Sequence, residues 1–194
     1  MRIIAGGLRS RTLQAPPGLA TRPTSDRLRE TLFNVLAPRI EGAAFLDLYA
    51  GSGAVGIEAL SRGAARVVFV ERAAPALKVL RTNLERLEIR DGFEVWTGAV
   101  SAFLRRGSPG FDVVFLDPPY DAEAEYATAL GLLGGTASEL LRNCALVIAE
   151  HRRKEKLNVD YGSLMRTRLL EQGDAALSFY SLPAKKLDEG DGQE

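Results

Sequence analysis

Short apolar runs alternate along most of the chain with longer segments in which leucines recur at helical spacing. The clearest helical segment extends from about Ala74 to Leu87, with an apolar stripe of leucines and a proline in its first turn. The runs of strand length are Ala44 to Tyr49, Arg66 to Val70, Phe93 to Thr97, Phe111 to Leu116 and Cys144 to Glu150, with two weaker ones at Leu164 to Leu170 and Ala175 to Ser181. Strands that alternate with helices form parallel sheets, so the pattern predicts an α/β fold.

The first 40 residues follow a different pattern. Ile3-Ile4 and Thr12-Leu13-Gln14 flank Gly6-Gly7, which predicts a hairpin. A helix is expected after Thr24-Ser25-Asp26, because these residues supply caps and a negative charge for a helix N-terminus. We therefore expect an N-terminal hairpin and helix extension (residues 1–40), a core domain (41–183) and an acidic, glycine-rich, disordered tail (184–194).

Composition narrows the class of protein. The 194 residues suffice for one domain with a hydrophobic core, and 25 basic residues balance 25 acidic ones. A single cysteine, Cys144, and a single histidine, His151, provide neither an internal disulfide nor a set of zinc ligands. No apolar stretch approaches the roughly 20 residues that span a bilayer, and no signal-peptide pattern opens the chain, so we expect a cytoplasmic protein.

Charge is unevenly distributed along the chain. Residues 1–40 contain seven arginines against two acids, hence a net charge of +5, which leaves −5 for the remainder. The segment is either a solvated arm or a surface that contacts phosphates, and polyanions favour local positive charge whatever the total. The candidate phosphate contacts are Arg9, Arg11, Arg22 and Arg27.

The first chemical motif is a glycine-rich loop after a strand. Asp47-Leu48-Tyr49 leads into Gly51-x-Gly53-x-x-Gly56, a pattern typical of nucleotide-binding loops, where glycines allow close approach and exposed N–H groups favour anions. Glu71, about 20 residues further on, is placed to accept the hydroxyl protons of a ribose. Asp47 would repel a dinucleotide pyrophosphate and suits the cationic aminoacyl end of S-adenosylmethionine, or it braces the loop through backbone hydrogen bonds.

The second motif is the turn Asp117-Pro118-Pro119-Tyr120, directly after a buried strand. Open parallel sheets bind ligands at the carboxyl ends of their strands. Since prolines lack an N–H and restrict the residues before them, the turn is stiff and presents only acceptors. An exocyclic base amine can donate both hydrogens there while its ring stacks on Tyr120. The motif favours an amine-binding site over a plain proline turn.

Together the two motifs resemble those of class I S-adenosylmethionine-dependent amino-methyltransferases. The segments Ala5 to Leu13 and Thr21 to Asn34 resemble, more narrowly, the bacterial 16S rRNA guanine-N2 methyltransferase family RsmD, and the resemblance covers roughly residues 1 to 182. It implies a Rossmann-like, seven-stranded, mostly parallel sheet with helices on both faces. It also implies S-adenosylmethionine as methyl donor and the N2 amine of one guanine of 16S rRNA as acceptor, in free RNA or a 30S particle. We expect a monomer without a metal or membrane contact.

The resemblance assigns roles to individual residues. The implied catalytic group is the acceptor turn, Asp117, Pro118, Pro119 and Tyr120. The implied cofactor contacts are Asp47, Tyr49, Gly51, Ser52, Gly53, Glu71, Arg72 and Ala99.

Several positions depart from the family pattern or lack a role in it. Ser10 lies where the family usually has glycine, which predicts a stiffer hairpin, and Gly98-Ala99 lies where a polar side chain often meets the adenine. Trp96 is either core or a neighbour of that adenine. We expect Cys144 to be a small core residue and His151 to lie in a solvated basic turn near the RNA.

Three other functions remain open. An NAD-dependent oxidoreductase would explain the glycine loop and Glu71 but not the acceptor turn. A catalytically silent RNA-binding assembly factor would explain only the basic segment. A DNA adenine-N6 methyltransferase would use the same four turn residues for a different amine.

Overall fold

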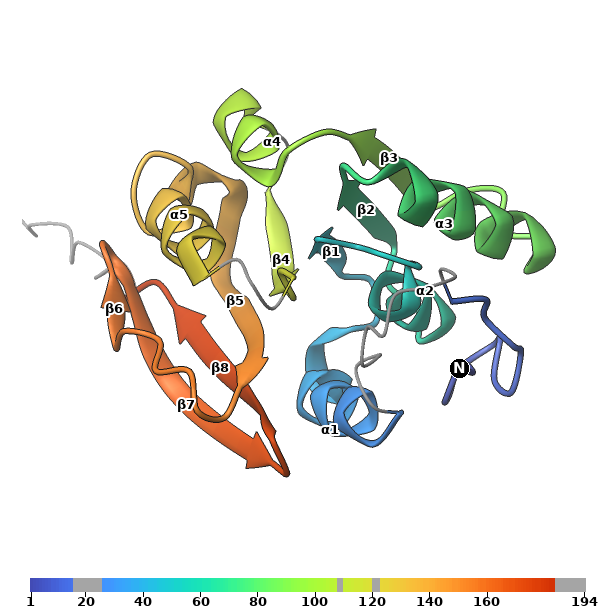
Figure 1. Cartoon of the computed structure of the whole chain (residues 1–194), viewed down its shortest axis with the longest axis horizontal. Helices are drawn as coiled ribbons and strands as arrows, with labels where there is room; N and C mark the ends of the chain where they lie inside the picture. The colour runs from blue at the N-terminus through green and yellow to red at the C-terminus, as the bar shows by residue number, and fades with distance from the viewer. Residues whose placement is uncertain (16–25, 108–109, 120–122, 184–194) are drawn as a thin grey trace, which may run out of the picture.

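Eight strands form one sheet in the computed structural model, which describes residues 1–15, 26–107, 110–119 and 123–183 (Figure 1). Their order across the sheet is β3-β2-β1-β4-β5-β8-β7-β6. The strands are β1 (Ala44–Leu48), β2 (Arg66–Glu71), β3 (Phe93–Thr97), β4 (Phe111–Leu116), β5 (Leu141–Arg152), β6 (Asp160–Tyr161), β7 (Leu164–Gln172) and β8 (Ala175–Ser181). β3, β2, β1, β4 and β5 pair in parallel, and β8, β7 and β6 continue the sheet antiparallel.

The Rossmann-like α/β prediction is confirmed, whereas the predicted count of seven strands is one too low. The additional strand, β6, consists only of Asp160 and Tyr161 and pairs with the start of β7. Two residues carry no periodicity, so the sequence pattern contains no signal for this strand.

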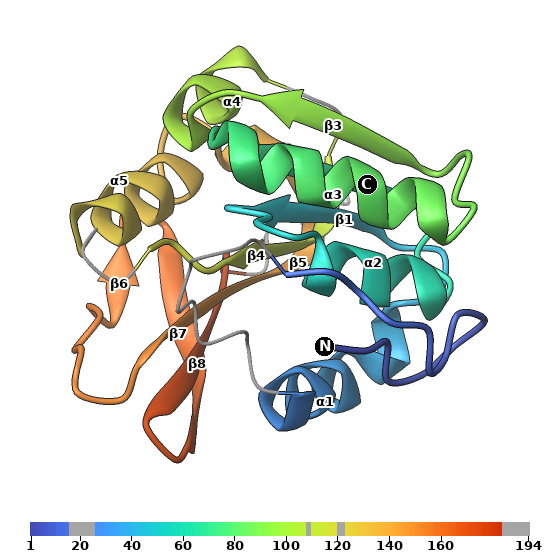
Figure 2. The ribbon, with the colours of Figure 1, turned by 45° about the vertical axis from the view of Figure 1, so that its right-hand side comes forward.

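Helices cover both faces of the sheet (Figure 2). One face packs against α1 (Asp26–Leu36), α2 (Ala54–Ser61) and α3 (Ala74–Arg86), and the other against α4 (Val100–Arg106) and α5 (Glu123–Leu133). Successive residues of β1 illustrate the division, because Phe45 faces the first group of helices and Leu46 the second. Burial on both faces explains why the parallel strands are almost continuously apolar. Short 3-10 turns follow α1 (Ala37–Arg39) and precede β5 (Ser138–Leu140). No helix in the described ranges is both long and apolar enough to cross a membrane.

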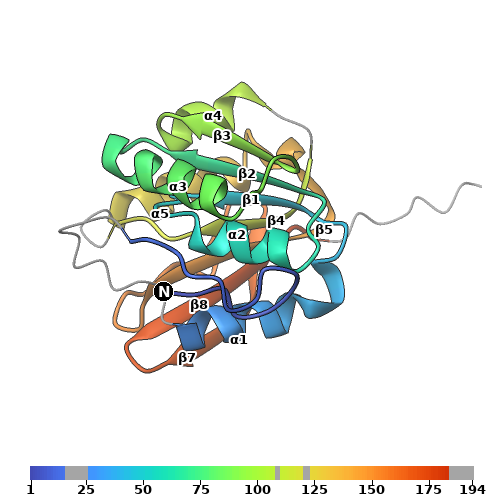
Figure 3. The same ribbon diagram turned by 90° about the vertical axis from the view of Figure 1, so that its right-hand side faces the viewer.

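The predicted N-terminal hairpin forms and packs against α2 (Figure 3). Arg2 and Thr12 pair antiparallel, and the Ser10 N–H donates to the Ile3 carbonyl at 2.9 Å. Ser10 has φ 68°, a left-handed conformation that glycine adopts without cost and that is unfavourable for a residue with a Cβ atom. A Cβ atom at Gly6 would lie 1.8 Å from the Ser61 carbonyl oxygen. The hairpin is therefore docked on the end of α2.

Two expectations about the fifth strand are wrong. Cys144 is exposed, with φ 63°, because the start of β5 departs from regular pairing with β4 between Leu141 and Leu146. His151 is buried at 4% exposure within β5, where its Nε2 lies 2.9 Å from the Ser178 hydroxyl and burial lowers its pKa. It is a core residue and does not lie in a solvated turn.

Candidate active site

The sheet topology brings the two sequence motifs together at one edge. β1 lies between β2 and β4, with Leu48 beside both Val70 and Leu116. The segments that leave these strands, starting with Tyr49, Glu71 and Asp117, are therefore neighbours although they are far apart in the chain. This edge carries the carboxyl ends of the parallel strands, where such sheets bind ligands.

Two of the site residues predicted from the sequence, Tyr120 and Arg22, lie outside the described residues.

The glycine loop has the backbone that its sequence predicts. Gly53 has φ 81° and is the N-cap of α2, and a Cβ atom there would lie 2.3 Å from Leu80 Cδ1 of α3. Glycine is thus required both by conformation and by packing. The loop is also tied to α3, because the Asn83 side chain donates to the Ser52 carbonyl at 2.9 Å. Asn83 was not predicted from the sequence, since a single asparagine in a helix has no distinctive local signal.

Glu71 is held by backbone donors. The Gly51 N–H donates to its Oε2 at 2.9 Å, and the N–H groups of Arg72 and Ala73 donate to its Oε1 at 2.8 and 2.7 Å. A carboxylate oxygen accepts about two hydrogen bonds, so Oε2 keeps one acceptor position while Oε1 is saturated. The carboxylate is positioned to accept one ribose hydroxyl without rearrangement, whereas the sequence motif predicted two.

Asp47 braces the glycine loop from within the protein. It is 2% exposed and accepts the Gly56 N–H at 2.9 Å, which ties β1 to the first turn of α2. Burial raises the pKa of Asp47 to about 7, an increase that the Gly56 hydrogen bond opposes and the Glu71 charge reinforces. Of the two roles considered for Asp47, the bracing role is the one this geometry displays.

Tyr49 and Arg72, both expected to contact the cofactor, meet at a residue that was not predicted from the sequence. The Tyr49 hydroxyl donates to Glu125 Oε2 at 2.8 Å, and Arg72 Nη1 lies 3.5 Å from Glu125 Oε1. Glu125 is the third residue of α5. Acidic residues are common in the first turn of helices, so its position alone did not distinguish it.

Asp117 lies at the end of β4 in a different environment. It is partly exposed, and none of the described residues donates a hydrogen bond to it. Burial and the negative charges of Glu150 and Asp47 raise its pKa well above its usual range. A carboxylate in such surroundings favours a ligand that brings hydrogen-bond donors. The adjacent Pro118 is buried and Pro119 is exposed.

The segment after β3 reaches the same edge. The Gly98 N–H donates to the Glu71 carbonyl at 3.0 Å, which places Ala99 near the proposed ribose contact. Trp96 is partly buried, packs edge-on against Phe103 at the margin of the core and lies under the Arg106 guanidinium. A Cβ atom at Gly98 would lie 3.0 Å from the Trp96 ring nitrogen, a contact that favours glycine here.

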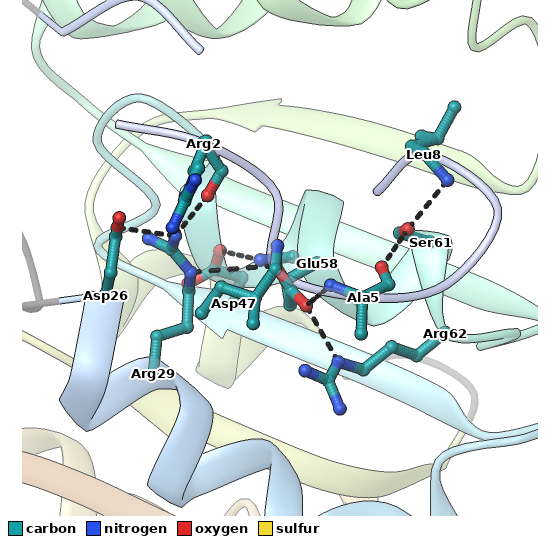
Figure 4. A network of polar contacts seen from close by, with 11 residues as sticks. Arg2, Ala5, Leu8, Asp26, Arg29, Asp47, Glu58, Ser61 and Arg62 are labelled. Atoms are coloured by element: carbon teal, nitrogen blue, oxygen red, sulfur yellow. Dashed lines mark hydrogen bonds and ion pairs between the residues drawn. The ribbon is translucent and has the colours of Figure 1, made fainter. Parts of the chain in front are cut away.

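The arginines of the N-terminal segment fall into two groups. Arg9, Arg11 and Arg27 are exposed and make no ion pair within the described ranges, as a phosphate-binding surface requires. Arg29, in contrast, is fully buried, pairs with Asp26 at 2.9 Å and lies 3.7 Å from Glu58 of α2 (Figure 4). Its charge is used inside the protein and does not contribute to a basic surface.

Glu58 and Ser61 fasten the N-terminal segment to α2. The backbone N–H groups of Ile4 and Ala5 donate to Glu58 at 2.8 and 3.0 Å, and the Leu8 N–H donates to the Ser61 hydroxyl at 3.0 Å (Figure 4). Neither residue was predicted from the sequence, because each lies more than 50 positions from its partner.

Comparisons with known proteins agree with this geometry. A family model described as "Conserved hypothetical protein 95" matches residues 1–181. The chain is 37% identical over 184 residues to "Putative rRNA methyltransferase YlbH" of Bacillus subtilis, covering 93% of this chain and 98% of that protein. It is 45% identical over 120 residues to "Ribosomal RNA small subunit methyltransferase D" of Escherichia coli, covering 62% of this chain and 60% of that protein.

A solved structure extends the similarity to the whole fold. "Putative methyltransferase yhhF from Escherichia coli" aligns with a TM-score of 0.82 and 36% identity, covering 95% of this chain and 99% of that one. At that coverage the similarity extends over the N-terminal segment as well as the core. On the family model and these relatives, the chain belongs to the Conserved hypothetical protein 95 family, which is that of the RsmD methyltransferases.

Proposed function

We propose that this protein transfers a methyl group from S-adenosylmethionine to the exocyclic N2 amine of a guanine in 16S rRNA. The observation that carries the proposal is the position of Asp117, an acceptor without a donor among the described residues, on the strand next to the glycine loop. Relatives named as small-subunit rRNA methyltransferases support the rRNA substrate.

The residues at the edge of the sheet fit the cofactor. Glu71 Oε2 retains an acceptor position for a ribose hydroxyl, and Gly51 is open to a ligand, because a Cβ atom there would meet only the Tyr49 carbonyl oxygen, at 3.9 Å. When bound, S-adenosylmethionine would supply an electrophilic methyl group, whose bond to sulfur breaks on transfer so that S-adenosylhomocysteine is the leaving group. Glu71 orients the ribose, Gly51 to Gly53 line the aminoacyl side, and Ala99 borders the adenine. Asp47 acts by holding the loop in position.

Asp117 and the Pro118 carbonyl act on the acceptor amine. This amine is a weak nucleophile because its lone pair is conjugated with the guanine ring. By accepting the two N2 hydrogens, these oxygens aim the lone pair at the methyl group and stabilise the positive charge that develops on nitrogen. One amine proton then passes toward the Asp117 carboxylate as the C–N bond forms. The base must leave its stack to reach this turn.

Arg9, Arg11 and Arg27 form the proposed phosphate-binding surface, together with Arg22. The first two lie on the docked hairpin and Arg27 on α1, so a rigid base supports each of them. Because the hairpin is fastened to α2, which carries the glycine loop at its start, RNA bound here is held in fixed relation to the cofactor site.

Analysis of the methylated nucleoside tests the proposal. The purified protein is incubated with labelled S-adenosylmethionine and either 16S rRNA transcribed in vitro or 30S subunits reconstituted from it, and digests are analysed by mass spectrometry. We expect N2-methylguanosine. N6-methyladenine from a DNA substrate, or no methylated nucleoside with either RNA, would contradict the proposal. Calorimetry with S-adenosylhomocysteine and NAD separates a methyltransferase from an oxidoreductase.

A further inference from the structure

Three loops at the carboxyl edge of the sheet converge on one side chain, that of Glu125. Tyr49 immediately precedes the glycine loop, Arg72 follows the ribose-binding Glu71, and Glu125 follows the acceptor turn at the start of α5. The Tyr49 hydroxyl donates to Glu125 Oε2 at 2.8 Å across 76 residues of sequence, and Arg72 lies 3.5 Å from Oε1. Glu125 therefore connects the two loops on the cofactor side to α5, the helix that follows the acceptor turn in the chain.

The Tyr49 contact has the features of a strong hydrogen bond. Its acceptor is a carboxylate whose side chain is only 27% exposed, and hydrogen bonds to charged acceptors are shorter and stronger than neutral ones. Burial and the Glu125 carboxylate raise the pKa of Tyr49, so the phenol remains a donor at neutral pH. The Arg72 ion pair is more exposed and contributes less, because solvent screens it.

Backbone conformation adds a second observation. Tyr49 has φ 63°, a left-handed conformation that is unfavourable for residues with a Cβ atom. Here it turns the chain from β1 into the glycine loop while the side chain reaches α5. A residue kept in such a conformation at the entrance to a binding loop indicates that its orientation matters.

We propose that Glu125 is a positioning residue, which through Tyr49 holds α5, the helix that follows Asp117 and Pro118 in the chain, at a set distance from the cofactor loop. This inference rests on the proposed methyl transfer. Hydrogen bonds of the sheet align β1 with β4 only as far as Leu48 and Leu116, so the loops beyond need a separate connection. A misplacement of about 1 Å between donor and acceptor can cost on the order of 100-fold in rate. In this proposal the Tyr49 hydroxyl positions α5, and binding of S-adenosylmethionine does not require that hydroxyl.

Four variants test the hydrogen bond between the Tyr49 hydroxyl and the Glu125 carboxylate, which we call the bridge. Tyr49→Phe removes the hydroxyl, Glu125→Ala removes the carboxylate, and the double variant removes both. Glu125→Gln keeps an oxygen that can accept from Tyr49 but loses the charge. Thr128→Ala, on the same helix, is the matched control, since its hydroxyl bonds only to the Ala124 carbonyl one turn away.

Single-turnover methyl transfer with both substrates saturating is the first measurement. We expect Tyr49→Phe and Glu125→Ala each to slow transfer about 10-fold, as loss of a charge-assisted hydrogen bond predicts. The double variant should be no slower than the slower single one, and Glu125→Gln should stay within about 3-fold of wild type. Affinity for S-adenosylhomocysteine should stay within about 3-fold throughout. The proposal would be overturned if the single variants transferred methyl at the wild-type rate, or if the loss in the double variant were the product of the two single losses. It would also be overturned if the loss of affinity for S-adenosylhomocysteine were as large as the loss of rate.

Hydrogen exchange supplies a measurement that needs no activity. The amides of residues 127–130 close the first turn of α5, so breaking the bridge should speed their exchange about 10-fold in Tyr49→Phe and not in Thr128→Ala. Unchanged exchange would contradict the bridge. Absence of methyl transfer by the wild-type protein would contradict the proposed function instead, while the exchange result would still decide whether Glu125 holds α5.

Discussion

The carboxylates on the two sides of the site lie on neighbouring strands but in opposite surroundings. On the cofactor side, Asp47 and Glu71 accept four backbone N–H groups between them, from Gly56 and from the loops that follow β1 and β2. On the acceptor side, Asp117 receives no hydrogen bond from the described residues and has Glu150 and Asp47 as negatively charged neighbours.

This difference indicates that the two sides of the site have different roles. Backbone donors fix the cofactor-side carboxylates before any ligand arrives, so that little reorganisation accompanies binding. In the proposed function, the Asp117 carboxylate gains its donors only when an amine enters the turn. Substitution of the cofactor-side carboxylates should therefore change affinity and stability, whereas substitution of Asp117 should change the rate of transfer.

Substitution of Asp117 should have the largest effect. We expect Asp117→Ala to slow single-turnover methyl transfer at least about 100-fold, because orientation of the amine and charge stabilisation are lost together. Affinity for S-adenosylhomocysteine should stay within about 3-fold, since Pro118 and Pro119 still restrict the turn. A variant that transferred methyl at close to the wild-type rate would remove the distinction between the two sides.

The raised pKa of Asp117 should limit the rate at low pH. The transfer rate should fall as pH decreases through this pKa, because only the ionised carboxylate can take up the amine proton, and the fall should begin above the usual range of an aspartate. A pH profile of the single-turnover rate measures this limb. A flat profile down to about pH 4, the usual range of an aspartate, would show that Asp117 is not the titrating acceptor.

Removal of Glu71 should mainly weaken cofactor binding. Glu71→Ala leaves three backbone N–H groups and a ribose hydroxyl without their acceptor, so we expect a loss of about 1–3 kcal/mol in the calorimetric affinity for S-adenosylhomocysteine. Glu94→Ala is a suitable control, because it removes a carboxylate from an exposed ion pair with Arg66 on the neighbouring strand. Equal affinities for the two variants would place the ribose elsewhere.

Neutralising the exposed arginines should weaken RNA binding without affecting the cofactor. With Arg9, Arg11 and Arg27 replaced by glutamine, the slope of log affinity against log salt should become shallower by about 0.7 for each phosphate of single-stranded RNA that is no longer neutralised. Affinity for S-adenosylhomocysteine should remain within about 2-fold. Arg142→Gln, at the start of β5, provides a control for the loss of a single positive charge elsewhere in the chain. An unchanged salt slope in the triple variant would exclude this surface.

The smallest effect on methyl transfer is expected for Asp47→Asn, which keeps an oxygen for the Gly56 N–H, and its effect should appear in stability. A carboxyl group whose pKa is about 7 when folded and near 4 when unfolded destabilises the fold increasingly between these pH values, because the folded state holds the proton longer. The stability of the asparagine variant relative to wild type should thus increase by up to about 3 kcal/mol between about pH 5 and pH 8. Melting temperatures at both pH values test this, and a difference that does not grow with pH would exclude a buried charge at Asp47.

Much of the fold and site could be predicted from local sequence patterns. The bounds of β3, β4 and β8 agree residue for residue with the apolar runs, and the glycine loop and the strand-end Asp117 lie where their motifs predict. Such features depend on residues within a few positions of one another. Apolar periodicity, glycine conformation and proline restriction all act over that range, so the sequence contains the information directly.

Contacts between distant segments were decided only by the tertiary structure. The hydrogen bond between Tyr49 and Glu125 joins residues 76 positions apart, and that between Asn83 and Gln14 joins residues 69 positions apart. Arg29, one of the arginines behind the positive charge of the N-terminal segment, is buried beside Glu58. His151, in a stretch that looks basic and exposed, is enclosed because β8 pairs with β5. A polar residue has no pattern that names its partner, because the partner is set by which strands and helices become neighbours once the apolar faces are buried.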